Sequence, residues 1–321
     1  MMTYRRLGSS GLSVSTVGLG CNNLGRAGTA AESQEGTDAV VHAAIDAGIT
    51  LFDVADSYGK APGVSEMQLG KALGDRRDDV VLATKFGLDL GGLNGPDWGA
   101  RGSRRYIIRA VEASLRRLGT EWIDLYQYHA PDVGTPIEET LAALDDLVTS
   151  GKVRYLGHSN FSGWQIAEAE FTARSGRYTP FISAQNSYSL LDRRLEQEVA
   201  PAVEAYGLGV LPYFPLANGL LTGKYRRNEV PAGSRLTHAR KNLLETADWD
   251  QLAAFSAFAA ERAVSEVQVA FSWLAAQPSV GSVIAGATTP EQVRQNAAAA
   301  DWTPSDADLT ELDALFPRPT T

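Results

Sequence analysis

Short apolar segments alternate with longer amphipathic segments along the chain. The short segments are typical of buried strands, and they cover residues 15–20, 49–55, 79–85, 123–129, 153–160, 181–187, 208–214 and 280–287. In the longer segments apolar residues recur at every third or fourth position, which is the spacing of one face of a helix. These segments predict helices over residues 33–48, 65–74, 104–119, 136–151, 162–176, 195–207, 265–277 and 290–300.

Eight strand-then-helix units in succession predict an α/β fold. No linker rich in Pro or Ser separates the units, so one (β/α)8 TIM barrel over residues 1–321 is favoured over two doubly wound domains. Residues 3–14, TYRRLGSSGLSV, precede the first unit and predict two short strands around a Ser-Ser-Gly turn. We expect this N-terminal β-hairpin to close the bottom of the barrel.

Two connections between the predicted elements are unusually long. Residues 86–103 follow the third strand, and residues 215–243 follow the seventh strand. Loops of this length are often functional, and loops that follow barrel strands lie on the face where barrel enzymes carry their active sites. We therefore expect both loops at the rim of an active site.

Composition and charge narrow the class of protein. With 44% hydrophobic and 21% charged residues, and no apolar run near the roughly 18 residues of a membrane span, the chain is predicted to be soluble and cytoplasmic, with no membrane partner. A single cysteine and four scattered histidines exclude an internal disulfide and indicate no metal site. The net charge of −9 argues against a nucleic-acid partner. Nothing in the pattern specifies an oligomeric state.

Chemically active side chains occur at the ends of three successive predicted strands. Asp53 ends the second strand with Tyr58 shortly after it, Lys85 ends the third, and His129 ends the fourth. Each alone could be a cap, a packed ring, a solvated charge or a core histidine. Together in a partly buried barrel mouth they must pair or shift their pKa values, and a lysine beside a tyrosine lowers the pKa of the phenol.

At these positions the chain resembles the aldo-keto reductases, over residues 3–316. The matching segments stand in family order: FDVADSYG, VVLATKFG, IDLYQYHAPD, GKVRYLGHSNF, AQNSYSLLDR, PLANGLLTGKY and GATTPEQVRQN. The resemblance is to the branch that includes bacterial reductases and potassium-channel beta subunits. It implies reduction of a small-molecule aldehyde or ketone by NADP(H), with Tyr58 as general acid, Lys85 supported by Asp53 to tune it, and His129 to orient the carbonyl.

The resemblance also implies where the cofactor binds. Ser159, Asn160 and Gln185 would hold the carboxamide, and Tyr213 would stack on the nicotinamide. The remaining contacts would come from the first strand end near the ribose, the seventh-strand loop over the pyrophosphate and the last helix start at the adenine end: Gly20, Cys21, Asn22, Pro215, Leu216, Asn218, Lys224, Arg235, Gly286, Thr288, Gln292 and Asn296.

Cofactor preference is the least specified feature. The resemblance places cations in many relatives where this chain has the neutral residues Gly286, Thr288 and Gln292. A 2′-phosphate would then be met by Arg235, by Arg294 or by helix N–H groups, and NAD(H) is possible. The substrate itself is expected to depend on the rim loops.

Two other functions stay open at this stage. A nucleotide-binding regulatory subunit with slow or no turnover would keep the same residues. An isomerase or aldolase on the same barrel would use Lys85 to form a Schiff base.

Overall fold

Parallel strands form the centre of the molecule in the computed structural model, which describes residues 2–227, 229–231, 236 and 240–319. The sheet order is β10-β3-β4-β5-β6-β7-β8-β9. In chain order the strands are β3 (Val17–Gly20), β4 (Leu51–Asp53), β5 (Val81–Phe86), β6 (Ile123–Tyr128), β7 (Val153–Ser159), β8 (Phe181–Gln185), β9 (Gly209–Val210) and β10 (Val283–Gly286).

Backbone hydrogen bonds join the last two strand segments and close the ring. The Val210 amide donates to the Ser279 carbonyl at 2.7 Å, and the Ile284 amide donates to the Pro212 carbonyl at 3.1 Å. β9 is shorter than the predicted strand 208–214, because Pro212 has no N–H to continue the ladder. The closed ring confirms the predicted barrel.

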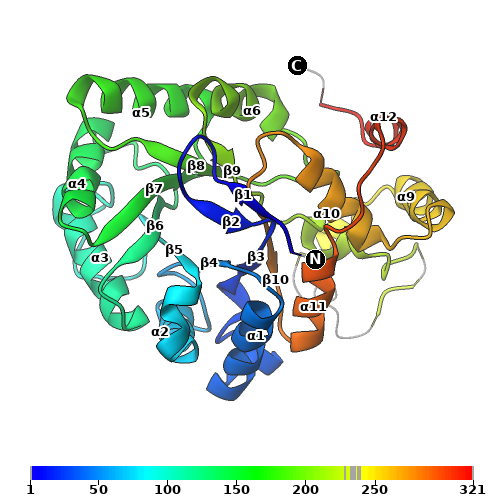
Figure 1. Cartoon of the computed structure of the whole chain (residues 1–321), viewed down its shortest axis with the longest axis horizontal. Coiled ribbons are helices and arrows are strands. Elements are labelled where there is room, and N and C mark those ends of the chain that lie inside the picture. The colour runs from blue at the N-terminus through cyan, green and yellow to red at the C-terminus, as the bar shows by residue number, and fades with distance from the viewer. Residues whose placement is uncertain (1, 228, 232–235, 237–239, 320–321) are drawn as a thin grey trace.

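Helices surround the strands as predicted (Figure 1). They are α1 (Gln34–Asp46), α2 (Val64–Leu73), α3 (Arg104–Leu118), α4 (Ile137–Thr149), α5 (Gly163–Gly176), α6 (Leu195–Tyr206), α10 (Glu266–Ala276) and α11 (Pro290–Ala298). Their apolar faces pack on the outward-facing strand residues and form the larger core of the protein. Within the described part of the chain, no helix is long and apolar enough to cross a membrane.

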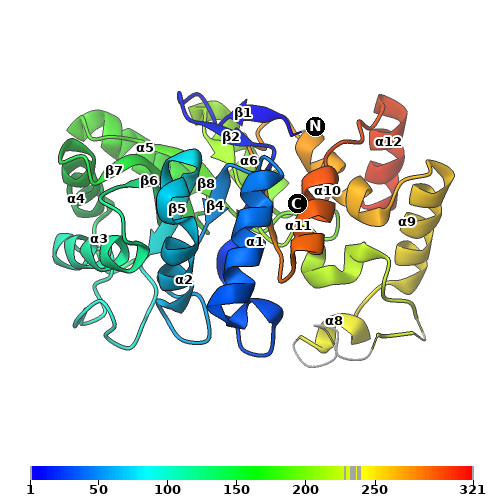
Figure 2. The same cartoon turned by 60° about the horizontal axis from the view of Figure 1, so that its bottom comes forward.

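The alternating pattern did not predict the helices α8 (Asn242–Glu245), α9 (Trp249–Glu261) and α12 (Asp306–Leu315). α9 and α12 lie side by side at one edge of the barrel (Figures 1 and 2). Arg262, directly after α9, donates to Asp308 at 2.6 Å and joins the two. Arg193 donates to Asp313 at 2.7 Å and ties α12 to the start of α6.

The hairpin predicted at the barrel bottom is present. β1 (Tyr4–Arg6) and β2 (Ser13–Ser15) pair antiparallel. Figure 1 shows them across the centre of the ring, and Figure 2 shows them on the side opposite α8 and the long β5–α3 loop. Leu7 and Val14 are fully buried against the apolar residues inside the barrel. The bottom of the barrel is therefore sealed by apolar packing, and the other end is left for polar groups.

The barrel interior changes from apolar to polar along β4, β5 and β6. Leu51, Ala83 and Leu125 belong to the inner apolar cluster. Because side chains alternate between the two faces of a strand, the residues two positions later face the same interior. These are the buried polar residues Asp53, Lys85 and Gln127. The period of two thus places charge at the C-terminal mouth of the barrel.

His158 on β7 offers a test of the packing outside the barrel ring. Its ring stacks on Phe161 with centroids 4.5 Å apart and meets the edge of Phe181, and neither ring nitrogen has a hydrogen-bond partner among the described residues. Burial lowers the pKa of His158 to about 3. The folded protein holds it neutral, whereas the unfolded chain protonates it below about pH 6.5.

We expect His158→Leu to flatten the pH dependence of stability. Between pH 6.5 and 3 the neutral histidine costs the folded state about 1.4 kcal/mol for each pH unit that the pH falls. Urea unfolding of both proteins from pH 7 to pH 5 measures the change in the free energy of unfolding with pH. Below pH 6.5 this slope should be smaller in the variant by about 1.4 kcal/mol per pH unit. An identical slope in the two proteins would contradict a neutral, unpartnered His158.

Candidate active site

A buried ion pair lies at the centre of the mouth. Lys85 Nζ donates to Asp53 Oδ2 at 2.7 Å and to the Val54 carbonyl at 3.0 Å, and the two charged side chains are 0% and 4% exposed. Burial alone lowers the pKa of Lys85, but Asp53 and Tyr58 outweigh that effect and raise it above its usual value. Lys85 is therefore a charged group with its protons already engaged.

Two glutamines complete the coordination of the Asp53 carboxylate. Gln127 and Gln185 each donate a side-chain N–H to Asp53 Oδ1 at 2.9 Å, so both carboxylate oxygens are hydrogen-bonded. Gln185 also donates to Gln127 Oε1 at 3.2 Å. Gln127 was not predicted from the sequence, although a polar residue in step with Lys85 on the neighbouring strand was the available signal.

Tyr58 stands over this pair. Lys85 Nζ lies 3.3 Å from Tyr58 Oη and 4.9 Å from the centre of its ring. Burial raises the pKa of the Tyr58 phenol above 10, and Lys85 opposes that rise. The expected lowering of the Tyr58 pKa by Lys85 is thus present, but the opposite effect of burial is larger, so the pKa lies above its usual value.

His129 faces the tyrosine from the end of β6. The two rings meet edge to face with centroids 5.9 Å apart. Burial, assisted by the charge of Lys85, lowers the pKa of His129 to about 3, so the imidazole is neutral at physiological pH. Its Nδ1 is buried and has no hydrogen-bond partner within the described residues. The structure thus brings together the four residues that the sequence placed at strand ends.

The residues expected to hold a nicotinamide carboxamide form a neighbouring polar row. Ser159 and Gln185 are register partners on β7 and β8, and Ser159 Oγ donates to the Gln185 carbonyl at 2.7 Å. Asn160 has a left-handed φ of 62° and donates to the His129 carbonyl at 2.9 Å. Tyr213 Oη donates to Asn160 Oδ1 at 2.8 Å. These residues are adjacent and converge on the mouth beside His129.

The segment after β9 has an unusual backbone. Phe214, Ala217 and Asn218 all have positive φ, between 46° and 60°. Such conformations are costly for residues other than glycine and cluster at ligand clamps. Asn218 Oδ1 is also buried without a hydrogen-bond partner in the part of the chain described. This strained segment contains Pro215 and Leu216, whereas the more distant Lys224 is exposed with its Nζ over the Tyr225 ring.

The residues expected at the ribose and adenine end lie near one another. Gly20 is the register partner of Gly286, and exposed Asn22 is the second residue after β3. Cys21 is fully buried with a raised pKa, so its thiol stays neutral and inside the protein. Thr288 and Gln292 are hydrogen-bonded at the start of α11, and Asn296 donates to the Gly286 carbonyl at 3.4 Å. Arg235 lies outside the described residues.

A second polar cluster lies behind the mouth and was not predicted. It consists of Asp56, Glu66, Asn94 and Arg117, joined by hydrogen bonds. Asp56 is fully buried only two residues before Tyr58. The sequence signal for this cluster was Glu66, a charged residue on the face of α2 that also carries Leu69 and Leu73.

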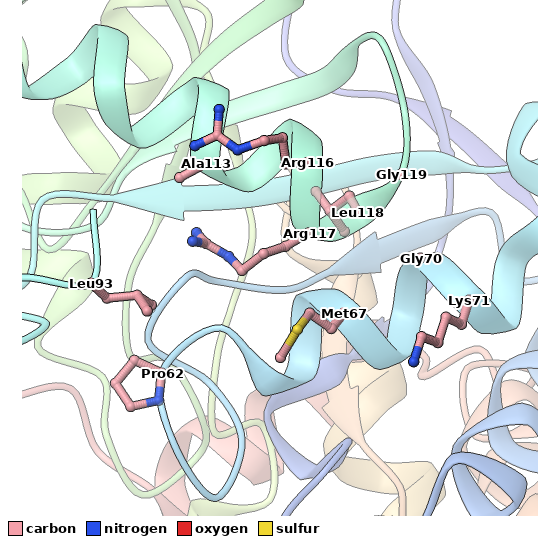
Figure 3. Close-up of a pocket in the computed structure, with 10 residues that line it drawn as sticks. All are labelled: Pro62, Met67, Gly70, Lys71, Leu93, Ala113, Arg116, Arg117, Leu118 and Gly119. Carbon is pink, nitrogen blue, oxygen red and sulfur yellow. The ribbon is translucent and has the colours of Figure 1, made fainter. Parts of the chain in front are cut away.

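A groove of about 640 Å³ lies outside this cluster, between α2 and α3 (Figure 3). Its lining includes Pro62 from the β4–α2 loop, Leu93 from the β5–α3 loop and Met67 from α2. Arg117 lines the groove as well, and its guanidinium reaches inward to Glu66 at 2.6 Å. The same arginine therefore contacts both the surface groove and the buried cluster.

Comparison with known proteins identifies the family of this chain. Residues 16–316 match the aldo/keto reductase family. The chain is 39% identical to the "uncharacterized oxidoreductase YrpG" of Bacillus subtilis (strain 168), with 99% of this chain and 97% of that protein covered. It is 36% identical to the L-glyceraldehyde 3-phosphate reductase of Escherichia coli (strain K12), with 97% and 92% covered. It is 37% identical to a probable voltage-gated potassium channel subunit beta of Oryza sativa subsp. japonica, with 94% and 92% covered. The chain belongs to the aldo/keto reductase family of oxidoreductases.

Proposed function

We propose that this protein reduces an aldehyde or ketone to the alcohol with NADP(H) or NAD(H). The observation that carries the proposal is the position of Lys85 Nζ between Asp53 Oδ2 and Tyr58 Oη at the mouth of the barrel. This arrangement places a proton donor beside a fixed positive charge, which suits protonation of an oxygen on which negative charge develops.

Tyr58 supplies the proton in this proposal. Its pKa is above 10, so the phenol is protonated at physiological pH and can act as an acid. As the proton leaves, the ammonium of Lys85 at 3.3 Å stabilises the phenolate that forms. Asp53 holds Lys85 in place through the 2.7 Å bond.

His129 orients the substrate. A neutral imidazole carries one N–H, and its pKa of about 3 means that it does not compete with Tyr58 as the acid. A hydrogen bond from His129 to the carbonyl oxygen would aim that oxygen at the phenol. This role requires no change in the charge of the histidine.

The polar row and the strained segment fit a nicotinamide cofactor. A bound cofactor supplies the hydride to the carbonyl carbon. Ser159, Asn160 and Gln185 would hold the carboxamide of the cofactor, and the ring of Tyr213 would stack on its nicotinamide ring. Asn218 Oδ1 has no hydrogen-bond partner among the described residues, and the backbone around it has positive φ values. Both features support a segment that clamps the rest of the cofactor.

The structure favours this function over a Schiff-base mechanism. A lysine nucleophile needs a lowered pKa, whereas Lys85 has a raised one and donates three hydrogen bonds. The alternative of a regulatory subunit draws on the relative from Oryza sativa. An aldehyde panel that includes glyceraldehyde 3-phosphate, run with NADPH and with NADH, separates turnover from binding alone.

Tyr58→Phe should abolish reduction and leave the fold and cofactor binding intact. The variant lacks only the hydroxyl that gives the proton, and a positioned general acid contributes roughly 10²- to 10⁴-fold to the rate. Steady-state oxidation of NADPH measures the loss, and fluorescence titration measures cofactor binding. Tyr206→Phe, on α6 and packed against Phe171, is the matched control. Near-normal turnover by Tyr58→Phe would refute the proposed acid.

Lys85→Met should impair reduction for an electrostatic reason. Lys85 opposes the rise in the pKa of Tyr58, so its removal raises that pKa further. The residual activity should therefore persist to higher pH than in the wild type, although at a lower rate. A pH profile from pH 6 to 11 checks this, with Lys71→Met on the exposed side of α2 as control. Full activity with an unchanged profile would show that Lys85 does not act on Tyr58.

We expect only a modest preference for NADPH over NADH, because Gly286, Thr288 and Gln292 are neutral. If Arg235 meets the 2′-phosphate, Arg235→Ala should weaken NADPH binding by about 1–3 kcal/mol and barely change NADH binding. Arg294→Ala, which removes a surface partner of Glu291, is the companion variant. An equal loss for both cofactors would assign Arg235 to their shared part, and no loss would exclude it from the site.

A further inference from the structure

Asn94 is buried within a loop that is otherwise largely exposed. It lies between β5 and α3 and is 6% exposed, whereas its neighbour Leu93 is 47% exposed and Trp98 is 76% exposed. Gly91, Gly92 and Gly95 lie near Asn94 and have positive φ. Glycine lacks a Cβ and restrains its own backbone little, so this loop needs side-chain contacts to hold its shape. The side chain of Asn94 is therefore the deepest polar attachment that we find in the described loop.

The Asn94 carboxamide joins three parts of the structure. Its Nδ2 donates to Asp56 Oδ2 at 2.9 Å and, more weakly, lies 3.4 Å from Tyr106 Oη. Its Oδ1 accepts from Arg117 Nη1 at 3.1 Å. One side chain thus connects the β5–α3 loop with the helix α3 and with the loop that carries Tyr58.

Asp56 links this attachment to the loop that carries Tyr58. The Gly63 amide donates to the Asp56 carbonyl at 2.7 Å, which closes the turn that contains Tyr58. A Cβ on Gly63 would meet Arg117 Cδ at 2.8 Å and Leu93 Cδ2 at 3.2 Å, so the β4–α2 loop and the β5–α3 loop are in close contact here. Asp56 Oδ1 is buried with no partner among the described residues, so Asn94 is the hydrogen-bond donor to this carboxyl.

Arg117 keeps Asn94 in place from the other side. Its Nε donates to Glu66 at 2.6 Å, and Glu66 in turn accepts from Thr84 Oγ1 at 2.6 Å. Figure 3 shows Arg117 reaching from α3 toward Leu93 and Pro62. Because Glu66 is fully buried and Arg117 is 12% exposed, this bridge is shielded from water and holds its geometry.

We propose that Asn94 is a positioning residue for specificity, which holds the β5–α3 loop against the Tyr58 loop and so sets the space for large carbonyl substrates. The inference rests on the proposed reductase function. A substrate with an aromatic or branched substituent would contact this loop, whereas a small aliphatic aldehyde would reach Tyr58 without touching it. Asn94 acts through the loop and has no part in proton transfer.

Asn94→Ala should separate KM from kcat according to substrate size. We expect the KM for 4-nitrobenzaldehyde to rise about tenfold, the scale of losing a buried hydrogen bond, while kcat and KM for propanal change less than about twofold. Asn94→Leu fills the same space without hydrogen bonds and should behave alike if Asn94→Ala is poorly folded. An equal fall in kcat for both substrates would overturn the proposal, because it would place Asn94 in the chemistry.

Two further variants test the geometry of the attachment. Asp89 lies on the same loop, and the contacts it makes among the described residues are to Arg101 and Gly91, so Asp89→Ala should leave both KM values unchanged. Asp56→Asn keeps an oxygen that can accept from Asn94 and should retain the wild-type difference between the substrates. Loss of propanal reduction in Asp56→Asn would show that the carboxyl itself acts on Tyr58, and it would refute a purely positional role.

Hydrogen exchange gives a readout that does not depend on activity. In Asn94→Ala we expect amides of residues 87–103 and 56–63 to exchange about tenfold faster, while those of the strands keep their rates. Unchanged exchange in both segments would refute the attachment even if the enzyme is active. If the wild type reduces no carbonyl compound, the proposed function fails, and the exchange result still decides whether Asn94 holds the loops together.

Discussion

The Lys85–Asp53 ion pair is the interaction on which the site depends. A buried charge is expensive unless its partner and its remaining hydrogen bonds are in place. Here Lys85 donates its other hydrogen bonds to the Val54 carbonyl and to Tyr58 Oη. Gln127 and Gln185 donate hydrogen bonds to Asp53 Oδ1, the carboxylate oxygen that the lysine does not contact. Each of these groups must occupy one position for the pair to be stable, so the pair also fixes the position of the phenol.

The same network reaches the side of the mouth where we propose that the cofactor binds. Gln185 contacts Asp53 through its side chain and Ser159 through its carbonyl, and Asn160 connects Tyr213 with the His129 carbonyl. The proposed proton donor and the proposed carboxamide site therefore share hydrogen-bond partners. Such shared partners make the relative placement of two reacting groups a property of the fold, which is the basis of preorganised catalysis.

The sequence predicted what depends on period and order. Alternation along strands and the barrel topology were enough to bring Asp53 and Lys85 together. The sequence did not predict contacts that depend on the depth of burial or on pairing between distant positions in the chain. Glu66 and Arg117 are separated by 51 positions, and nothing in their local pattern indicates that they meet. The rise in the pKa of Tyr58 was likewise not predictable, because burial depends on how loops close over the mouth. Helices α9 and α12 stand outside the strand-helix alternation and gave no signal in it.

Strand β5 separates two buried polar networks that meet again at the Tyr58 loop. Lys85 faces the barrel interior and binds Asp53, while its neighbour Thr84 faces the helices and binds Glu66. Successive residues of one strand must point to opposite faces, so both networks follow from a single stretch of sequence. The inner network holds Tyr58 through Lys85, and the outer network holds Asp56 through Asn94 and Arg117. The loop with the proposed acid is restrained from both sides of the barrel wall, and its geometry therefore exists before any substrate binds.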